Sequence, residues 1–101
     1  MADEMLGTLV LNELEQGHEI PVIVRGNSME PTYHDGDLLR VAKTTNYYVG
    51  DIIVFNFLGK QIVHRIIKIN NWRLLCKGDH AQAIQEITIH DVIGKVIRKE
   101  T

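Results

Sequence analysis

Two spacings of apolar residues divide the chain into an N-terminal segment and a longer segment that follows it. Within residues 2–16, apolar side chains recur three or four positions apart and acidic ones fall mostly between them, which predicts an amphipathic helix. Asp3 and Glu4 suit the positive end of that helix, and Gly17 suits its end. We expect the apolar stripe to pack on the core of the domain. It consists of Met5, Leu6, Leu9, Val10 and Leu14.

From residue 20 onward, the apolar residues form short runs separated by Gly, Asn and Asp, a pattern typical of strands joined by turns. The runs on the two sides of residues 58–60 predict a β-hairpin. Several short strands of this kind favour a small, mainly β fold, a coiled sheet or barrel, with one N-terminal helix. The six expected strands are residues 21–24, 38–42, 51–57, 61–69, 72–76 and 93–98.

The length and composition of the chain favour a single globular domain. A chain of 101 residues has room for one domain, which we expect over residues 1–101. Its amphipathic helix falls in residues 1–19 and its mainly β core in residues 20–101. Apolar residues make up 45% of the sequence and charged residues 24%, which is typical of a globular protein with one modest core.

The charge and hydropathy patterns disfavour some partners. A formal net charge of -2 disfavours nucleic acid, and no run approaches the roughly 20 apolar residues that cross a bilayer, so no transmembrane segment is expected. The acidic N-terminus is unlike a secretory signal, and the polar face of the expected helix lacks the basic residues that favour a membrane surface. We expect a cytoplasmic protein, and the sequence does not indicate its oligomeric state.

Neither cysteine nor histidine spacing indicates a metal site. The single cysteine, Cys76, has no partner for an internal disulfide, and its apolar neighbours predict a small buried side chain on a strand. The five histidines match no standard ligand spacing, so we expect no metal and no other cofactor. A site formed by His64, Asp79 and His80 is the alternative that the spacing leaves open.

The most informative stretch is residues 25–32, with the sequence RGNSMEPT. Gly26 permits backbone conformations that other residues avoid, and Pro31 restricts φ, so Ser28 between them lies on a constrained loop at the end of a strand. A nucleophile needs this combination of exposure and limited freedom. Taken alone, the same pattern is typical of an ordinary turn.

An ordered series of motifs over residues 22–98 resembles the type I signal peptidases. The motifs are SMEPT (28–32), DGDLLRV (35–41), GDIIVF (50–55), VHRI (63–66), KGD (77–79) and DVIGKV (91–96). The histidine in VHRI is typical of the branch found in the endoplasmic reticulum, archaea and some spore-forming bacteria, whereas the common bacterial branch has a lysine. The resemblance implies a catalytic core shared with the self-cleaving SOS-type repressors. It also implies that Ser28 is the nucleophile, His64 the general base and Asp79 the acidic residue near the histidine.

These residue types are chemically suited to the implied roles. A serine hydroxyl is a weak nucleophile until a base takes its proton, and histidine, with an ordinary pKa of about 6.5, can accept and return that proton near neutral pH. A carboxylate on the far ring nitrogen fixes the tautomer and stabilises the imidazolium. Relatives of the histidine branch often carry Asn and a further Asp after the KGD motif, where this chain has HAQ, so Glu86 and Asp91 are alternative carboxylates.

The oxyanion of the transition state also needs donors. The resemblance assigns this role to the backbone N–H of Ser28. Some relatives add a hydroxyl two residues earlier, but Gly26 has none. The residues expected to bind substrate or the oxyanion are Asn27, Met29 and Pro31. Three further carboxylates are expected to hold turns: Asp35, Asp37 and Asp51.

The sequence therefore predicts a serine endopeptidase that cleaves a precursor or leader peptide through Ser28 and His64, with Asp79. The substrate is expected to bind in an extended form along a sheet edge, and relatives prefer small side chains before the cut. One alternative is a non-catalytic peptide-binding module of the same fold that assists peptide maturation. A self-cleaving regulator is disfavoured, because residues 1–27 contain no Ala-Gly bond of the kind such proteins cut.

Overall fold

The structure is a computed structural model that describes residues 13–100, and this part of the chain is mostly β. Residues 13–15 are helical and residue 16, the predicted last residue of the N-terminal helix, lies in a turn; residues 2–12 of that prediction lie outside the described residues. The elements are β1 (Ile20–Ile23), β2 (Leu38–Ala42), β3 (Ile52–Phe57), β4 (Lys60–Asn70), β5 (Arg73–Lys77), β6 (Ile84–Thr88), the 3-10 helix η1 (Ile89–Asp91) and β7 (Val92–Lys99).

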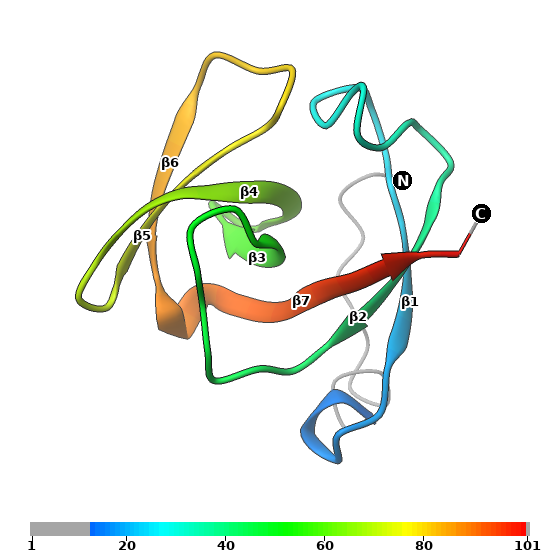
Figure 1. The fold of residues 1–101 in the computed structure, drawn as a ribbon, viewed down its shortest axis with the longest axis horizontal. Helices are drawn as coiled ribbons and strands as arrows, with labels where there is room; N and C mark the ends of the chain where they lie inside the picture. Colours follow the sequence, from blue (N-terminus) through cyan, green and yellow to red (C-terminus); the bar gives the residue numbers. More distant parts are fainter. Residues whose placement is uncertain (1–12, 101) are drawn as a thin grey trace.

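All seven strands belong to one open antiparallel sheet, in the order β1-β2-β7-β3-β4-β5-β6. The C-terminal strand β7 pairs with β2 on one side and β3 on the other, so it joins the two halves of the sheet. The register shifts within three of the strand pairs, and such irregularities bend strands. The sheet accordingly coils, with β1 and β2 on one side of the molecule and β5 and β6 on the other (Figure 1). The predicted fold class, mainly β with a coiled sheet, is confirmed.

Buried apolar side chains form two clusters inside this coil. Leu14, just before β1, packs with residues of β1, β2 and β3 and is 3% exposed. Of the apolar stripe predicted on the N-terminal helix, Leu14 is the member that the structure describes, and it packs on the core as expected. The second cluster lies across β3, β4, β5 and β6, and its members are Ile53, Phe55, Ile66, Leu74, Cys76 and Ile87.

The six strands predicted from sequence are confirmed, with ends that differ by a residue or two, and β6 was not predicted. Its sequence, IQEIT, places Gln85 on the buried face, where an alternating pattern calls for an apolar residue. The adjacent polar residues Gln85 and Glu86 therefore interrupt the alternation that would have predicted this strand. The strand forms because each of its residues pairs with β5, in a register that sets Gln85 opposite Cys76.

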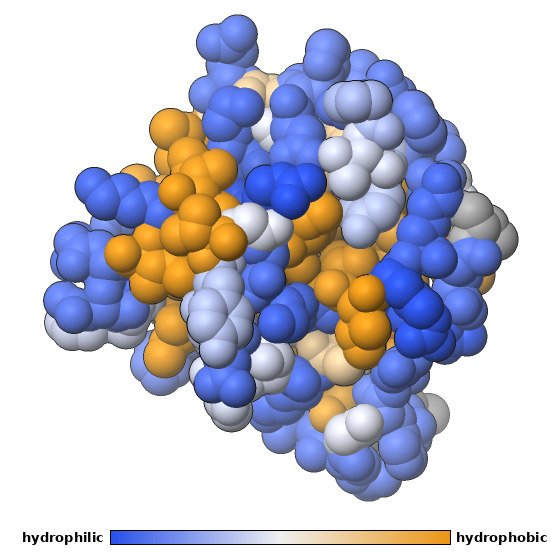
Figure 2. Space-filling view, viewed as in Figure 1, coloured by the Kyte–Doolittle hydropathy of each residue, from blue (hydrophilic) through white to orange (hydrophobic). Residues whose placement is uncertain are grey.

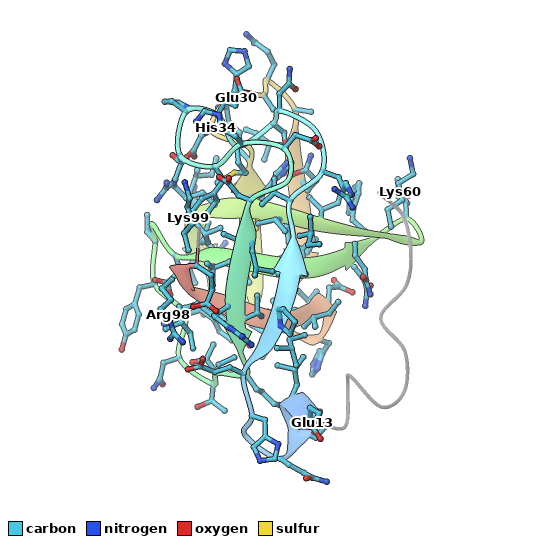
Figure 3. All side chains as sticks on the ribbon, turned by 90° about the vertical axis from the view of Figure 1, so that its right-hand side faces the viewer. Glu13, Glu30, His34, Lys60, Arg98 and Lys99 are labelled. Carbon is cyan, nitrogen blue, oxygen red and sulfur yellow. The ribbon has the colours of Figure 1, made fainter. Side chains whose placement is uncertain are left out.

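Two loops meet at one end of the molecule. Residues 24–37 connect β1 to β2, and residues 78–83 connect β5 to β6; both loops lie at the top of Figure 1. In the side view, Glu30 and His34 mark this end, and Glu13 lies at the opposite end (Figure 3). The residues of most chemical interest lie where the two loops approach the middle of β4 and the start of β6. Within residues 13–100, no helix is long and apolar enough to span a membrane.

Candidate active site

The loop that carries Ser28 is closed by its own hydrogen bonds. The N–H of Val24 donates to the carbonyl of Asp37 (2.9 Å), and the N–H of Gly36 donates back to the carbonyl of Val24 (2.8 Å). Gly26 has φ +83°, a left-handed conformation that favours glycine, and its N–H donates to Oδ1 of Asp35 (2.7 Å). The carboxylate of Asp37 accepts from the N–H of His34 (2.8 Å), so both Asp35 and Asp37 hold turns, as predicted. Asp51 does the same elsewhere by accepting from the N–H of Tyr48 (2.9 Å).

Ser28 is held at two points by residues distant in sequence. Its Oγ lies 3.1 Å from Nε2 of His64, which comes from β4. Its carbonyl accepts a hydrogen bond from the N–H of His80 in the β5–β6 loop (2.7 Å). The next side chain, Met29, is 1% exposed and anchors the loop in the interior. The hydroxyl is thus fixed relative to the imidazole.

His64 lies on the inner face of β4, where its side chain is almost fully enclosed. It is 6% exposed, and its ring meets that of Phe55 edge-on, with centroids 6.1 Å apart. Its second nitrogen, Nδ1, lies 2.7 Å from Oε1 of Gln85, which comes from β6. Because burial penalises the charged form, the pKa of His64 falls below the ordinary 6.5, although Gln85 and the charge of Asp79 act in the opposite direction. The ring is neutral near pH 7 and able to accept a proton.

Gly78 allows the β5–β6 loop to reach Ser28. A Cβ at this position would lie 2.5 Å from the carbonyl oxygen of Ser28 and 2.9 Å from Nε2 of His64. Contacts this short do not occur for real Cβ atoms. The absence of a side chain at Gly78 is therefore a condition for the close approach of these residues.

Asp79 forms its hydrogen bonds with Arg65 and Thr32 and not with the ring of His64, although its charge acts on that ring. Both carboxylate oxygens accept hydrogen bonds from Arg65, Oδ1 from Nε (2.9 Å) and Oδ2 from Nη2 (2.8 Å), and Oδ2 also accepts from the hydroxyl of Thr32. The planar guanidinium satisfies both oxygens at once, which explains why the carboxylate faces Arg65. These bonds hold the pKa of Asp79 below its ordinary value. Asp79 therefore links β4 to the Ser28 loop. Gln85, rather than Asp79, contacts the second ring nitrogen of His64.

The alternative carboxylates are also engaged elsewhere. Glu86 forms an exposed ion pair with Arg73 on β5 (3.1 Å). Asp91 caps η1 by accepting from the N–H of Thr88 (2.9 Å). Neither carboxylate hydrogen-bonds to the imidazole. The partner of Nδ1 is Gln85, which sequence reasoning missed. The sequence signal for this role is a polar residue, Gln85, at a buried position of β6, a strand that was not predicted.

The three residues expected to bind substrate or the oxyanion surround Ser28 in the same loop. Asn27 and Pro31 are exposed, and the carbonyl of Asn27 accepts from the N–H of Glu30 (3.2 Å). Met29 is buried as a whole residue, and its carbonyl accepts from the N–H of Tyr33 (3.0 Å). Among residues 13–100, no backbone acceptor outside the strands takes the N–H of Ser28.

Other candidate chemistry receives little support in the described part of the chain. Residues 13–100 contain no group of three or more His, Cys, Asp or Glu side chains placed to hold a metal ion. The Cys76 side chain is fully buried on β5, as predicted, and burial raises the pKa of its thiol to about 12. A thiol in this state is a core side chain rather than a nucleophile.

Comparisons with known proteins agree with the motif resemblance. A family model described as Peptidase S24-like matches residues 3–97. The signal peptidase complex catalytic subunit SEC11 of Plasmodium falciparum is 39% identical over 72 residues, which cover 63% of this chain and 39% of the relative. SEC11 of Candida tropicalis is 36% identical over 87 residues, covering 79% and 52%. Human SEC11C is 40% identical over 77 residues, covering 63% and 38%.

The chain therefore spans about half or less of the length of these curated relatives. The resemblance to signal peptidases inferred from the ordered motifs is confirmed by these matches. Because the family model covers nearly the whole sequence, the chain belongs to the Peptidase S24-like family.

Proposed function

We propose that this protein is a serine endopeptidase in which Ser28 is the nucleophile and His64 the general base. The observation that carries the proposal is the 3.1 Å contact between Oγ of Ser28 and Nε2 of His64. A serine within hydrogen-bond reach of a neutral imidazole can lose its proton as it attacks. The family match and the named relatives support peptide-bond hydrolysis as the reaction.

The reaction proceeds in two halves. Oγ of Ser28 attacks the scissile carbonyl while its proton passes to Nε2 of His64, and the resulting oxyanion accepts from the N–H of Ser28. His64 then returns the proton to the leaving amine, so the C–N bond breaks and an acyl ester remains on Ser28. In the second half, water attacks the ester carbon and gives a proton to His64. His64 then returns that proton to Oγ of Ser28 as the ester bond breaks, which releases the acid product and restores both residues.

The proposed substrate is an extended segment of a precursor or leader peptide. In the described sheet, β1 and β6 are the edge strands, and the Ser28 loop follows β1 directly. An extended peptide can add to such an edge through backbone hydrogen bonds. Apolar side chains gather over β5 and β6 on the face shown in Figure 2. On β6, Ile84 is 54% exposed. This surface suits apolar side chains near the cut.

Ser28 is the only serine in the sequence, which makes a direct test possible. Intact-mass measurement after treatment with a fluorophosphonate should show one adduct on the wild-type protein. The adduct should be absent from Ser28→Ala and strongly reduced in His64→Ala. His90→Ala is a matched control, because His90 is an exposed histidine of η1 and should leave labelling unchanged.

Cleavage of a mixed peptide library, followed by mass spectrometry, then gives the sequence preference. Loss of cleavage in both Ser28→Ala and His64→Ala supports the proposal, and cleavage that survives Ser28→Ala refutes the nucleophile assignment. The peptide-binding alternative draws on Gln85, because a neutral amide stabilises an imidazolium less than a carboxylate does. Folded wild-type protein that retains particular peptides without cutting them favours that alternative.

A further inference from the structure

We propose that Gln85 is a positioning residue that holds His64 in the one neutral tautomer able to take a proton from Ser28. The inference rests on the proposed function, since it concerns the base of that reaction. It starts from the 2.7 Å contact between Nδ1 of His64 and Oε1 of Gln85. An amide oxygen can only accept, so Nδ1 carries the proton and donates it. Nε2 is then the unprotonated nitrogen and faces the hydroxyl of Ser28.

The sheet places Gln85 so that it has little freedom to turn away. Gln85 is 8% exposed and pairs with Cys76 across β5 and β6, and Cys76 pairs with Ile66 on β4. His64 lies two residues before Ile66 on the same face of β4. The amide of Gln85 therefore reaches the imidazole from a neighbouring strand within one layer of side chains, in surroundings where an unmade hydrogen bond is costly.

An amide performs only part of the task of a carboxylate. It orients the ring and selects the tautomer, but it carries no charge to stabilise the imidazolium that forms during catalysis. The charged groups acting on His64 are Asp79, which favours the imidazolium, and Lys77, which opposes it. Asp79 is itself paired with Arg65. The Cys76 thiol on β5 is neutral near pH 7, because burial raises its pKa to about 12. The base of this protein thus operates without a carboxylate on its second nitrogen, which makes the consequence of adding one measurable.

The test is nitrogen-15 NMR of the histidine side chains in the wild type and in Gln85→Glu and Gln85→Met, combined with kcat and KM as functions of pH. In the wild type, His64 should be the Nδ1–H tautomer. Gln85→Glu should raise the pKa of His64 by about one to three units and move the acid limb of kcat/KM upward with it. Gln85→Met, which keeps the length but removes the acceptor, should shift His64 toward the Nε2–H tautomer and lower kcat about ten-fold or more, with little change in KM.

Glu86→Gln is the matched control, since Glu86 is exposed on the opposite face of β6 and pairs with Arg73. It should leave the tautomer and titration of His64 unchanged. An Nε2–H tautomer of His64 in the wild type overturns the inference, and so does an unchanged pKa of His64 in Gln85→Glu. These two measurements decide the matter even if Gln85→Met does not fold. If the wild type cuts no peptide and forms no Ser28 adduct, the proposed peptidase fails, whereas the NMR result still decides the position of Gln85.

Discussion

Replacing Gly78 with alanine should inactivate the site while the sheet remains intact. The new Cβ would lie 2.5 Å from the carbonyl oxygen of Ser28, and real Cβ atoms keep at least 3.0 Å from such atoms. The two loops must therefore separate by about 0.5 Å or more. A shift of that size along the Ser28–His64 direction lengthens the present 3.1 Å contact beyond hydrogen-bond range.

The magnitude follows from two separate costs. Forcing a methyl group into a packed contact destabilises a protein by about 1–3 kcal/mol. Misplacing a reacting group by about 1 Å costs roughly 100-fold in rate, and half that displacement should still cost about ten-fold. We therefore expect Gly78→Ala to lower kcat/KM and the rate of fluorophosphonate labelling at Ser28 by about 10- to 100-fold. Its urea unfolding should show a loss of about 1–3 kcal/mol.

Gly59→Ala serves as the control for this experiment. Gly59 lies in the β3–β4 turn with φ +79° and nothing within 4 Å of the position of a Cβ. Alanine there should cost about 1 kcal/mol through backbone strain and leave labelling unchanged. Full labelling and unchanged stability in Gly78→Ala would refute the reasoning, because they would mean that the loops are not in contact as the structure places them.

Three further outcomes follow from the charges and burial of the site. Because burial lowers the pKa of His64, kcat/KM should stay constant as pH falls to about 6.5 and decline only below it. Stability should also fall below about pH 6.5, where the unfolded chain binds the proton that the folded one resists, and an acid limb above pH 6.5 contradicts this account. Asp79→Asn should cost about 1–3 kcal/mol in urea unfolding, because it weakens the paired bonds from Arg65, and an unchanged midpoint contradicts a linking role. Cys76, with a thiol pKa raised to about 12, should react with a disulfide reagent at pH 8 at least about 100-fold more slowly in folded than in urea-unfolded protein, and equal rates would show that β5 is open.

Much of the fold followed from local sequence signals. Alternating apolar residues and turn residues predicted six strands, because a half-buried strand repeats every two residues regardless of which strand it joins. β6 was not predicted, because the polar Gln85 at a buried position interrupts that alternation. The pairing of β7 with both β2 and β3 is also absent from any local pattern, since it depends on contacts between segments distant in the sequence.

The candidate site was likewise predictable from the sequence only in part. The local pattern alone indicated only a constrained loop and a strand histidine. Ser28 and His64 were chosen because the ordered motifs around them resemble those of the signal peptidases. Their separation of 3.1 Å depends on the coiling of the sheet, which closes the distance between β4 and the loop after β1. The roles of Asp79 and Gln85 depended on tertiary structure alone. The guanidinium of Arg65 satisfies both oxygens of Asp79, and the cross-strand register of β6 delivers an amide to His64 instead. A hydrogen-bond partner is chosen by proximity and geometry in the folded chain, and neither is encoded in the spacing of residues along it.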